Sequence, residues 1–255
     1  MRVVDSRRMT GTRPRSRKRW TRRYLPPQHG AWAMLLVPFI VGVVLAGPAW
    51  VQLPLLVAWL AGYLLSYYVF MAVKTRRIDR VRDQLVLYTA ITVPSVILAA
   101  LMAPRLLYFA PAFAVLVAAN AWFAWRKQER AVFNDLVSVV QGCLMVPVAA
   151  VAVGATVESV IPAFVVVLLY FTGTVLFVKT MIRERGEVAY LRASIAFHAV
   201  AVLVSMLIHW SLAVFFGWLL VRSVTFPRHK MSPLRLGVIE IVNSVVLVVL
   251  LAVVG

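Results

Sequence analysis

Charged residues are scarce in this chain of 255 residues. They make up 14% of the sequence, whereas a typical soluble domain has about a quarter. Hydrophobic residue types account for 62%. Apolar runs of about 17–25 residues recur along the whole length, which is typical of membrane-spanning helices. The composition therefore argues against a soluble globular protein.

Cysteine and acidic residues are also rare. The single cysteine, Cys143, lies inside an apolar run, which excludes an internal disulfide and a cysteine-based metal site. Nine Asp and Glu stand against 27 Lys and Arg. The basic residues form short clusters between apolar runs and no separate basic domain, so we expect no nucleic-acid partner. The chain also lacks a P-loop, a zinc signature, a Rossmann fingerprint and a nucleophile elbow.

The apolar runs predict an all-α polytopic membrane protein with nine transmembrane helices. We place the helices at residues 31–47, 52–73, 85–103, 106–125, 135–153, 159–178, 188–208, 211–227 and 235–254. The links between them are short, so residues 26–255 form a single transmembrane domain. Residues 1–25 are rich in basic residues and predict a disordered cytoplasmic arm that lies on anionic lipid headgroups.

The basic residues also predict the orientation. Every Lys and Arg except Arg105 falls on one side of the predicted topology. Because positive charge collects in cytoplasmic loops, the N-terminus is expected in the cytoplasm and the C-terminus outside. We expect the protein in a bacterial plasma membrane, in contact with membrane lipids.

Two predicted cytoplasmic helix ends carry nearly the same charged phrase. "VKTRRIDR" covers residues 73–80 and follows the second span, and "VKTMIRER" covers residues 178–185 and follows the sixth. The simplest explanation is anchoring, because any cytoplasmic helix end collects Lys and Arg that reach the headgroups. The alternative is a paired functional site.

A paired site has a chemical rationale if both helices continue through the phrase. Thr75 and Asp79 then share a face, as do Thr180 and Glu184, so that each helix end offers cations beside an acid. Two such ends could hold a phosphate directly and a second one through Mg²⁺. The phosphate-binding candidates are Lys74, Arg77, Lys179, Arg183, Arg185 and His29, and the candidate Mg²⁺ ligands are Asp79, Asp83 and Glu184.

Several spans carry polar residues that lipid does not favour. Such residues face either a packed bundle, where they hydrogen-bond between helices, or a wet cavity. They concentrate in the cytoplasmic half, which favours a cavity open to the cytoplasm. Glu240 needs a partner, for which Arg235, Arg222 or a basic residue elsewhere in the chain are candidates. Prolines inside spans, such as Pro147, are expected to kink helices. The cavity-lining candidates are Asn134, Gln141, Tyr190, Ser194, His198 and Glu240.

The stretches "QHGAWAMLLVPF" and "FTGTVLFVKTMIRER", followed by Tyr190, Ser194 and His198, resemble the YwiC-like family of bacterial integral membrane proteins. The resemblance covers nearly everything after residue 25.

A more distant resemblance is to the UbiA-type intramembrane prenyltransferases. That resemblance implies a nine-helix bundle with two acidic motifs, after helices two and six, that bind Mg²⁺ and a prenyl diphosphate. Asp79 and Asp83 match the last two acids of the first motif, N-D-x-x-D-x-x-x-D, while Thr75 and Arg76 replace its first pair. The second motif is D-x-x-x-D, with its two acids four positions apart. Here Glu184 and Glu187 are only three positions apart.

The leading functional hypothesis is therefore binding of an isoprenoid or lipid phosphate in a cavity open to the cytoplasm, with prenyl transfer as its enzymatic form. The alternatives are a non-enzymatic transporter, a lipid-binding protein or a membrane scaffold.

Overall fold

The structure is a computed structural model, which describes residues 24–25 and 31–254. The described part consists of α-helices with three short 3₁₀ segments and contains no strand. The α-helices are α2 (Ala31–Ala46), α3 (Gln52–Thr75), α4 (Arg82–Met102), α5 (Ala110–Trp125), α6 (Val132–Cys143), α7 (Met145–Val151), α8 (Val157–Ile182), α9 (Val188–Ile208), α10 (Trp210–Thr225) and α11 (Pro233–Val254). The 3₁₀ segments are η1 (Ile78–Arg80), η2 (Pro104–Phe109) and η3 (Phe226–Arg228).

Eight helical segments of the described chain are long and apolar enough to cross a membrane. Three of them combine neighbouring elements, since η2 continues into α5, α6 continues into α7 and α10 continues into η3. The remaining apolar helix, α2, has 16 residues. Large apolar side chains cover the outside of the bundle, with Leu207 88% exposed and Leu101 75% exposed. These features identify a multi-pass membrane protein.

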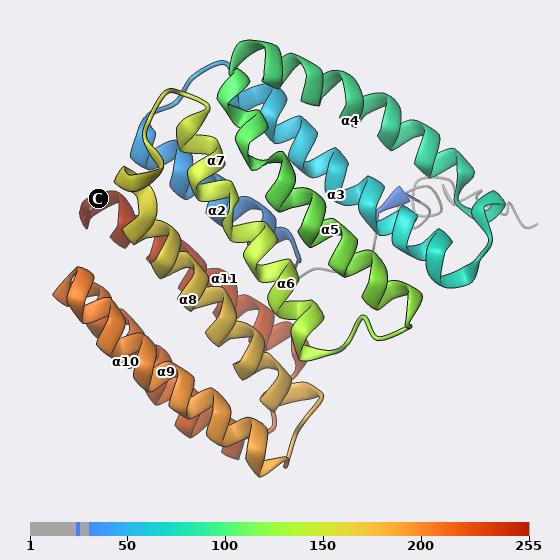
Figure 1. Cartoon of the computed structure of the whole chain (residues 1–255). Helices are drawn as coiled ribbons and strands as arrows, with labels where there is room; N and C mark the ends of the chain where they lie inside the picture. The colour runs from blue at the N-terminus through green and yellow to red at the C-terminus, as the bar shows by residue number, and fades with distance from the viewer. Residues whose placement is uncertain (1–23, 26–30, 255) are drawn as a thin grey trace, which may run out of the picture.

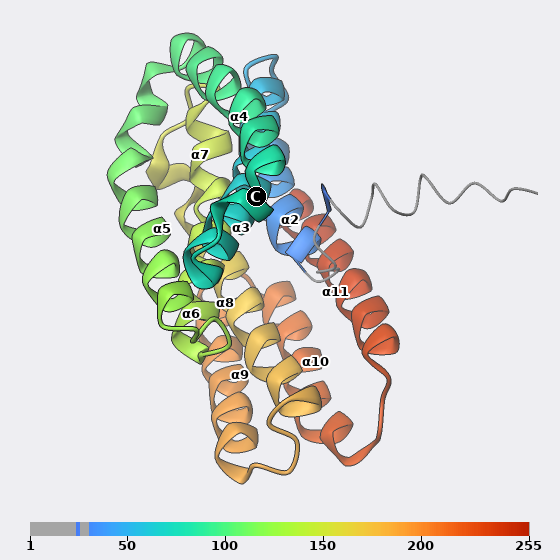
Figure 2. The same cartoon turned by 90° about the vertical axis from the view of Figure 1, so that its right-hand side faces the viewer.

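The helices are arranged around α2, α6, α7 and α8, with a helical pair on each side (Figure 1). The α3–α4 pair lies on one side and the α9–α10 pair on the other, and α11 packs against α2 and α8. Figure 2 shows α11 as a separate helix beside α10. The connections α3–α4, α5–α6, α8–α9 and α10–α11 lie at the same end of the bundle, which we call the basic end.

Close contacts of helix backbones fix α2 in the centre. A Cβ atom added to Gly42 would overlap the carbonyl oxygen of Val146 and lie 2.9 Å from the Cβ of Ala149. One added to Gly142 would lie 3.0 Å from the carbonyl oxygen of Met34. Glycine is therefore needed where α2 crosses α6 and α7.

The break between α6 and α7 agrees with the expected effect of Pro147, which has no N–H group to bond the carbonyl of Cys143. Other prolines inside predicted spans do not interrupt their helices. Pro38 and Pro94 lie inside the continuous helices α2 and α4. Pro111 stands in the first turn of α5, where proline is tolerated.

The condition on which a paired site depends is not met, because neither helix continues to the end of its charged phrase. α3 ends at Thr75, because Arg76 adopts the left-handed conformation with a φ of 53°. Asp79 therefore lies in η1 and does not share a helical face with Thr75. α8 ends at Ile182, so Glu184 lies beyond the helix.

Candidate functional site

The two repeated lysines meet the same connection at the basic end. Lys74 lies in the last turn of α3, and its Nζ is 2.8 Å from a carboxylate oxygen of Glu129. Lys179 lies in the last turn of α8, and its Nζ is 2.8 Å from a carboxylate oxygen of Asp135. Glu129 belongs to the α5–α6 connection and Asp135 to the first turn of α6. The two phrases thus approach one short segment, residues 129–135.

The two ion pairs differ in their exposure. The side chain of Lys74 is 46% exposed and that of Glu129 is 33% exposed, so water reaches this pair. The side chain of Lys179 is only 5% exposed, and its Nζ also donates a hydrogen bond of 2.8 Å to the carbonyl of Arg130. Lys179 thus links α8 to α6 through two contacts of its buried side chain, and removal of one partner of such a pair is costly. The exposed pair of Lys74 contributes little.

The other charged candidates at this end are spread over separate elements. Asp79 is exposed in η1, and Asp83 is exposed in the first turn of α4. Arg77, Arg183 and Arg185 are exposed, and His29 lies outside the described residues. Within the described ranges, no group of three or more His, Cys, Asp or Glu side chains is placed to hold a metal ion. The described candidates therefore do not form a cluster that would hold Mg²⁺, and binding of Mg²⁺ by this protein stays a prediction.

Asn134, Ser138 and Gln141 form a polar stripe on α6, and this stripe makes hydrogen bonds to α5 and to the α5–α6 connection. Asn120 Nδ2 donates to Oε1 of Gln141 over 3.0 Å, and Ser138 Oγ donates to Oδ1 of Asn120 over 3.0 Å. Asn134 Nδ2 donates to the carbonyl of Glu129 over 2.9 Å and so holds the α5–α6 connection. These contacts favour the alternative of interhelical hydrogen bonding for this stripe, and they orient the segment that both lysines reach.

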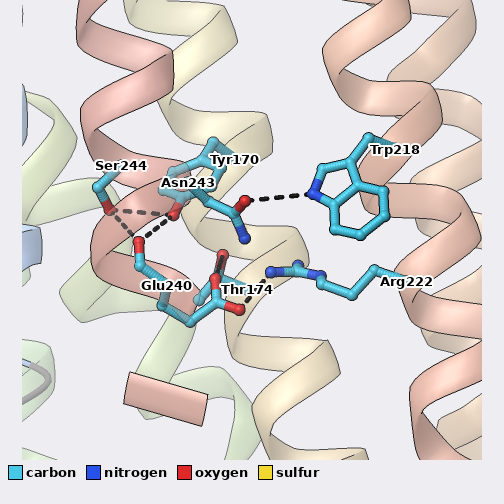
Figure 3. A network of polar contacts seen from close by, with 7 residues as sticks. All are labelled: Tyr170, Thr174, Trp218, Arg222, Glu240, Asn243 and Ser244. Carbon is cyan, nitrogen blue, oxygen red and sulfur yellow. Dashed lines mark hydrogen bonds and ion pairs between the residues drawn. The ribbon is translucent and has the colours of Figure 1, made fainter. Parts of the chain in front are cut away.

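A second polar cluster lies between α8, α10 and α11 (Figure 3). The guanidinium Nη1 of Arg222 forms an ion pair with Oε1 of Glu240, and Thr174 Oγ1 donates to Oε2 of Glu240 over 3.1 Å. Arg222 therefore provides the partner that the sequence required for Glu240. Tyr170 Oη donates to the backbone carbonyl of Glu240 over 3.0 Å, so α8 contacts both the side chain and the backbone of this residue. A charged side chain within a membrane bundle is costly unless an opposite charge pairs with it in this way.

Arg222 is fully buried. Its guanidinium carbon lies 4.1 Å from the centre of the Phe177 ring, which adds a cation–π contact. Its Nε and Nη2 atoms are buried without a hydrogen-bond partner among the described residues, as is Nδ2 of Asn243. Oδ1 of Asn243 accepts a hydrogen bond of 3.2 Å from Trp218 Nε1, which bridges α10 and α11. The cluster thus contains donors that none of the described residues satisfies.

His198 lies in a polar stripe of α9 that includes Tyr190 and Ser194, and it faces the inside of the bundle with an exposure of 1%. Its Nδ1 lies 2.7 Å from the carbonyl of Ser194 on the same helix. The ring packs against Gly173, where an added Cβ would lie 3.0 Å from Nε2. Ser194 is buried as well, and Tyr190 is half-buried near the start of α9. The buried part of the stripe therefore serves the packing of α9 on α8, and a cavity lined by these residues stays a prediction.

The sequence patterns indicated Arg222 and Glu240 of the cluster in Figure 3, but not Tyr170, Thr174, Trp218 or Ser244. Tyr170 and Thr174 are four residues apart in an apolar run, as are Glu240 and Ser244. Polar residues at this spacing on two predicted helices would have indicated facing partners. Nothing in the sequence distinguished Trp218 from a tryptophan at the membrane interface.

Comparison with known proteins gives relatives over nearly the whole chain. The model of a family described as YwiC-like protein matches residues 25–150. A protein of Haemophilus influenzae, described as uncharacterised, is 34% identical over 89% of this chain and 96% of its own length. The uncharacterised protein YwiC of Bacillus subtilis is 30% identical over 86% of this chain and 93% of its own length. No solved structure matches the chain.

Proposed function

The chain belongs to the YwiC-like family, and we propose that it binds a lipid carrying a phosphate group at the basic end of its bundle. We expect this end to face the cytoplasm of the bacterial cell, because positive charge collects on that side of the plasma membrane. The relatives in two bacteria support the plasma membrane as the location.

The observation that carries the proposal is the approach of Lys74 and Lys179 to one short segment. Around this segment, the charged phrases and the α5–α6 connection contain more Lys and Arg than Asp and Glu. An excess of positive charge at the level of the headgroups attracts anionic lipids. The excess also explains why two internal ion pairs do not neutralise the site.

The two lysines have different roles in this proposal. Lys179 is buried, and its bonds to Asp135 and to the carbonyl of Arg130 hold the α5–α6 connection in position. Lys74 is accessible, and its exposed pair with Glu129 is weak enough for a phosphate to displace the carboxylate. The exposed Arg77, Arg183 and Arg185 supply further donors that match phosphate oxygens.

Two sources of the phosphate group fit this chemistry: a glycerolipid such as phosphatidic acid, and an isoprenoid phosphate. The resemblance to the UbiA-type prenyltransferases favours the second source. We propose binding only and include neither Mg²⁺ nor a transfer step, because the carboxylates that such a step requires lie on separate elements.

The test is a binding measurement on the full chain in nanodiscs of phosphatidylcholine. Native mass spectrometry would record the retained lipids after titration with phosphatidic acid or with farnesyl phosphate. We expect selective retention of at least one phosphate lipid and its loss in Lys74→Gln. The matched control is Arg105→Gln, which removes an exposed cation at the other end of the bundle. Equal effects of the two substitutions, or retention of phosphatidylcholine alone, would contradict the proposal and favour a scaffold role.

A further inference from the structure

Two cations at the basic end adopt a backbone conformation that glycine usually occupies. Among the described residues, the non-glycine residues with positive φ are Arg76, at 53°, and Lys127, at 58°. Arg76 ends α3, and Lys127 lies two residues after Trp125, the last residue of α5. A side chain in this left-handed region clashes with its own backbone, whereas glycine has no such clash. Both positions therefore keep a side chain although it strains the backbone.

The chain uses glycine where the same turn occurs elsewhere. The turn after α5 closes with two backbone hydrogen bonds, from residues 127 and 128 back to the carbonyls of residues 124 and 123. The turn after α7 closes with the same pair of bonds, from residues 154 and 155 to residues 151 and 150, and its left-handed residue is Gly154. Glycine is the common residue at this position of the turn. The connections after α2 and α8 likewise use Gly47 and Gly186. The backbone alone therefore does not require a lysine at position 127.

The two strained turns are joined by one exposed ion pair. This pair links Lys74, in the last turn of α3, to Glu129, in the α5–α6 connection, over 2.8 Å. Figure 1 shows the ends of α3 and α5 next to each other. Arg76 lies two residues after Lys74, and Lys127 lies two residues before Glu129. Two Cα steps span at most about 7.6 Å, so each strained cation lies beside one member of the pair.

The two turns carry a large excess of positive charge. Residues 74–77 and 126–130 contain one acid, Glu129, and six exposed cations, namely Lys74, Arg76, Arg77, Arg126, Lys127 and Arg130. A phosphate monoester carries about −1.5 to −2 charges at pH 7 and has three terminal oxygens that accept hydrogen bonds. A phosphodiester carries a single negative charge. The excess of cations therefore favours a lipid whose headgroup is a phosphate monoester.

We infer that Arg76 and Lys127 bind the phosphate of a phosphomonoester lipid together with Lys74. The inference rests on the proposed function, and it adds two binding residues and the class of headgroup to the same site. The phosphate displaces Glu129 from Lys74, and the two turns then offer three exposed cations to the three terminal oxygens. Strained backbone is common at binding sites, because the strain fixes side chains where a ligand requires them.

The test replaces each strained cation with glycine in the full chain, in phosphatidylcholine nanodiscs, with phosphatidic acid and farnesyl phosphate as separate probes. Arg76→Gly and Lys127→Gly should each weaken the affinity for the retained phosphate lipid about fivefold, the effect of one Lys or Arg near an anionic surface. Their melting temperatures should equal or exceed that of the wild type, because glycine adopts this conformation without a clash. The control is Arg192→Gln, which removes an exposed cation near the start of α9, at the same end of the bundle. It should leave the affinity unchanged.

The comparison lipid is phosphatidylglycerol, a phosphodiester, which should bind more weakly than the phosphomonoester probe. Equal binding of phosphatidylglycerol would overturn the assignment of the headgroup. Unchanged affinity in both glycine variants, with binding lost in Lys74→Gln, would overturn the inference and leave the proposed function intact.

Two further results would also contradict the inference. Lower melting temperatures of the glycine variants would mean that Arg76 and Lys127 support the turns and not the ligand. An equal loss of affinity in Arg192→Gln would mean that the whole charged surface attracts the lipid. A wild-type protein that retains neither phosphate lipid would overturn the inference and the proposed function together.

Discussion

Lys74 and Lys179 contact carboxylates on the same short segment, although the two lysines end helices that lie far apart in the sequence. Lys74 pairs with Glu129 and Lys179 pairs with Asp135. The two copies of the repeated phrase therefore lie beside the same segment, residues 129–135, at the basic end. This segment provides one carboxylate to the exposed Lys74 and another to the buried Lys179.

The difference in burial predicts unequal effects on stability. Lys179→Met leaves the half-buried carboxylate of Asp135 without its partner and should lower the free energy of unfolding by about 3 kcal/mol. Lys74→Met removes an exposed pair and should cost less than about 1 kcal/mol. Thermal unfolding of the two variants in detergent measures the difference. Equal losses would show that the two lysines play the same structural role.

The ion pair between Arg222 and Glu240 predicts strong coupling. Removal of either charge alone, in Arg222→Met or Glu240→Gln, should destabilise the protein by about 3–5 kcal/mol, because the other charge stays buried. The double variant should lose less than the sum of the single losses. A double-mutant cycle on unfolding in detergent gives the coupling energy, and additive losses would mean that the two side chains do not interact.

The crossing of α2 and α7 predicts intolerance of a methyl group at Gly42. Gly42→Ala would force the helix backbones apart and should cost about 1–3 kcal/mol or prevent folding. Gly217→Ala is the matched control, because an added Cβ there meets nothing within 4 Å. The melting temperatures of the two variants, recorded with the yield of monodisperse protein, make the comparison. A Gly42→Ala variant as stable as the control would contradict this packing.

The orientation is tested by reporter fusions. Fusions after Arg82, Lys127 and Arg185 should report a cytoplasmic location, because these residues lie in the basic connections. A fusion after Val254 should report the outside. If the fusion after Val254 is cytoplasmic, the count of nine spans is wrong and one apolar segment does not cross the membrane. The first candidate is α2, because it is shorter than the eight other apolar segments.

The sequence predicts the helices well because apolar runs of membrane-crossing length are strong signals. The predicted ranges 52–73, 188–208 and 235–254 differ by few residues from α3, α9 and α11. The ends are harder to predict. Arg76 ends α3 in a left-handed conformation that usually favours glycine, so no residue type marks the stop.

The site could be predicted only in part, because partners depend on tertiary packing. Glu240 requires a cation on grounds of energy alone, which led to Arg222 as one of two named candidates. Nothing in the sequence assigns Glu129 to Lys74 or Asp135 to Lys179, because these pairs depend on how α3, α6 and α8 pack. Among the described residues, the lack of a cluster of three or more candidate metal ligands likewise reflects where α3 and α8 end.

The most direct test of the proposed function is the affinity of Glu129→Gln for the phosphate lipid that the wild-type protein retains. In the proposal, Glu129 competes with the phosphate for Lys74, so the substitution should tighten binding by up to about fivefold, the equivalent of an exposed ion pair of about 1 kcal/mol. Glu158→Gln, which removes an exposed carboxylate at the other end of α8, should leave the affinity unchanged. Weaker binding by Glu129→Gln, or equal affinities in all three proteins, would contradict a phosphate site at Lys74.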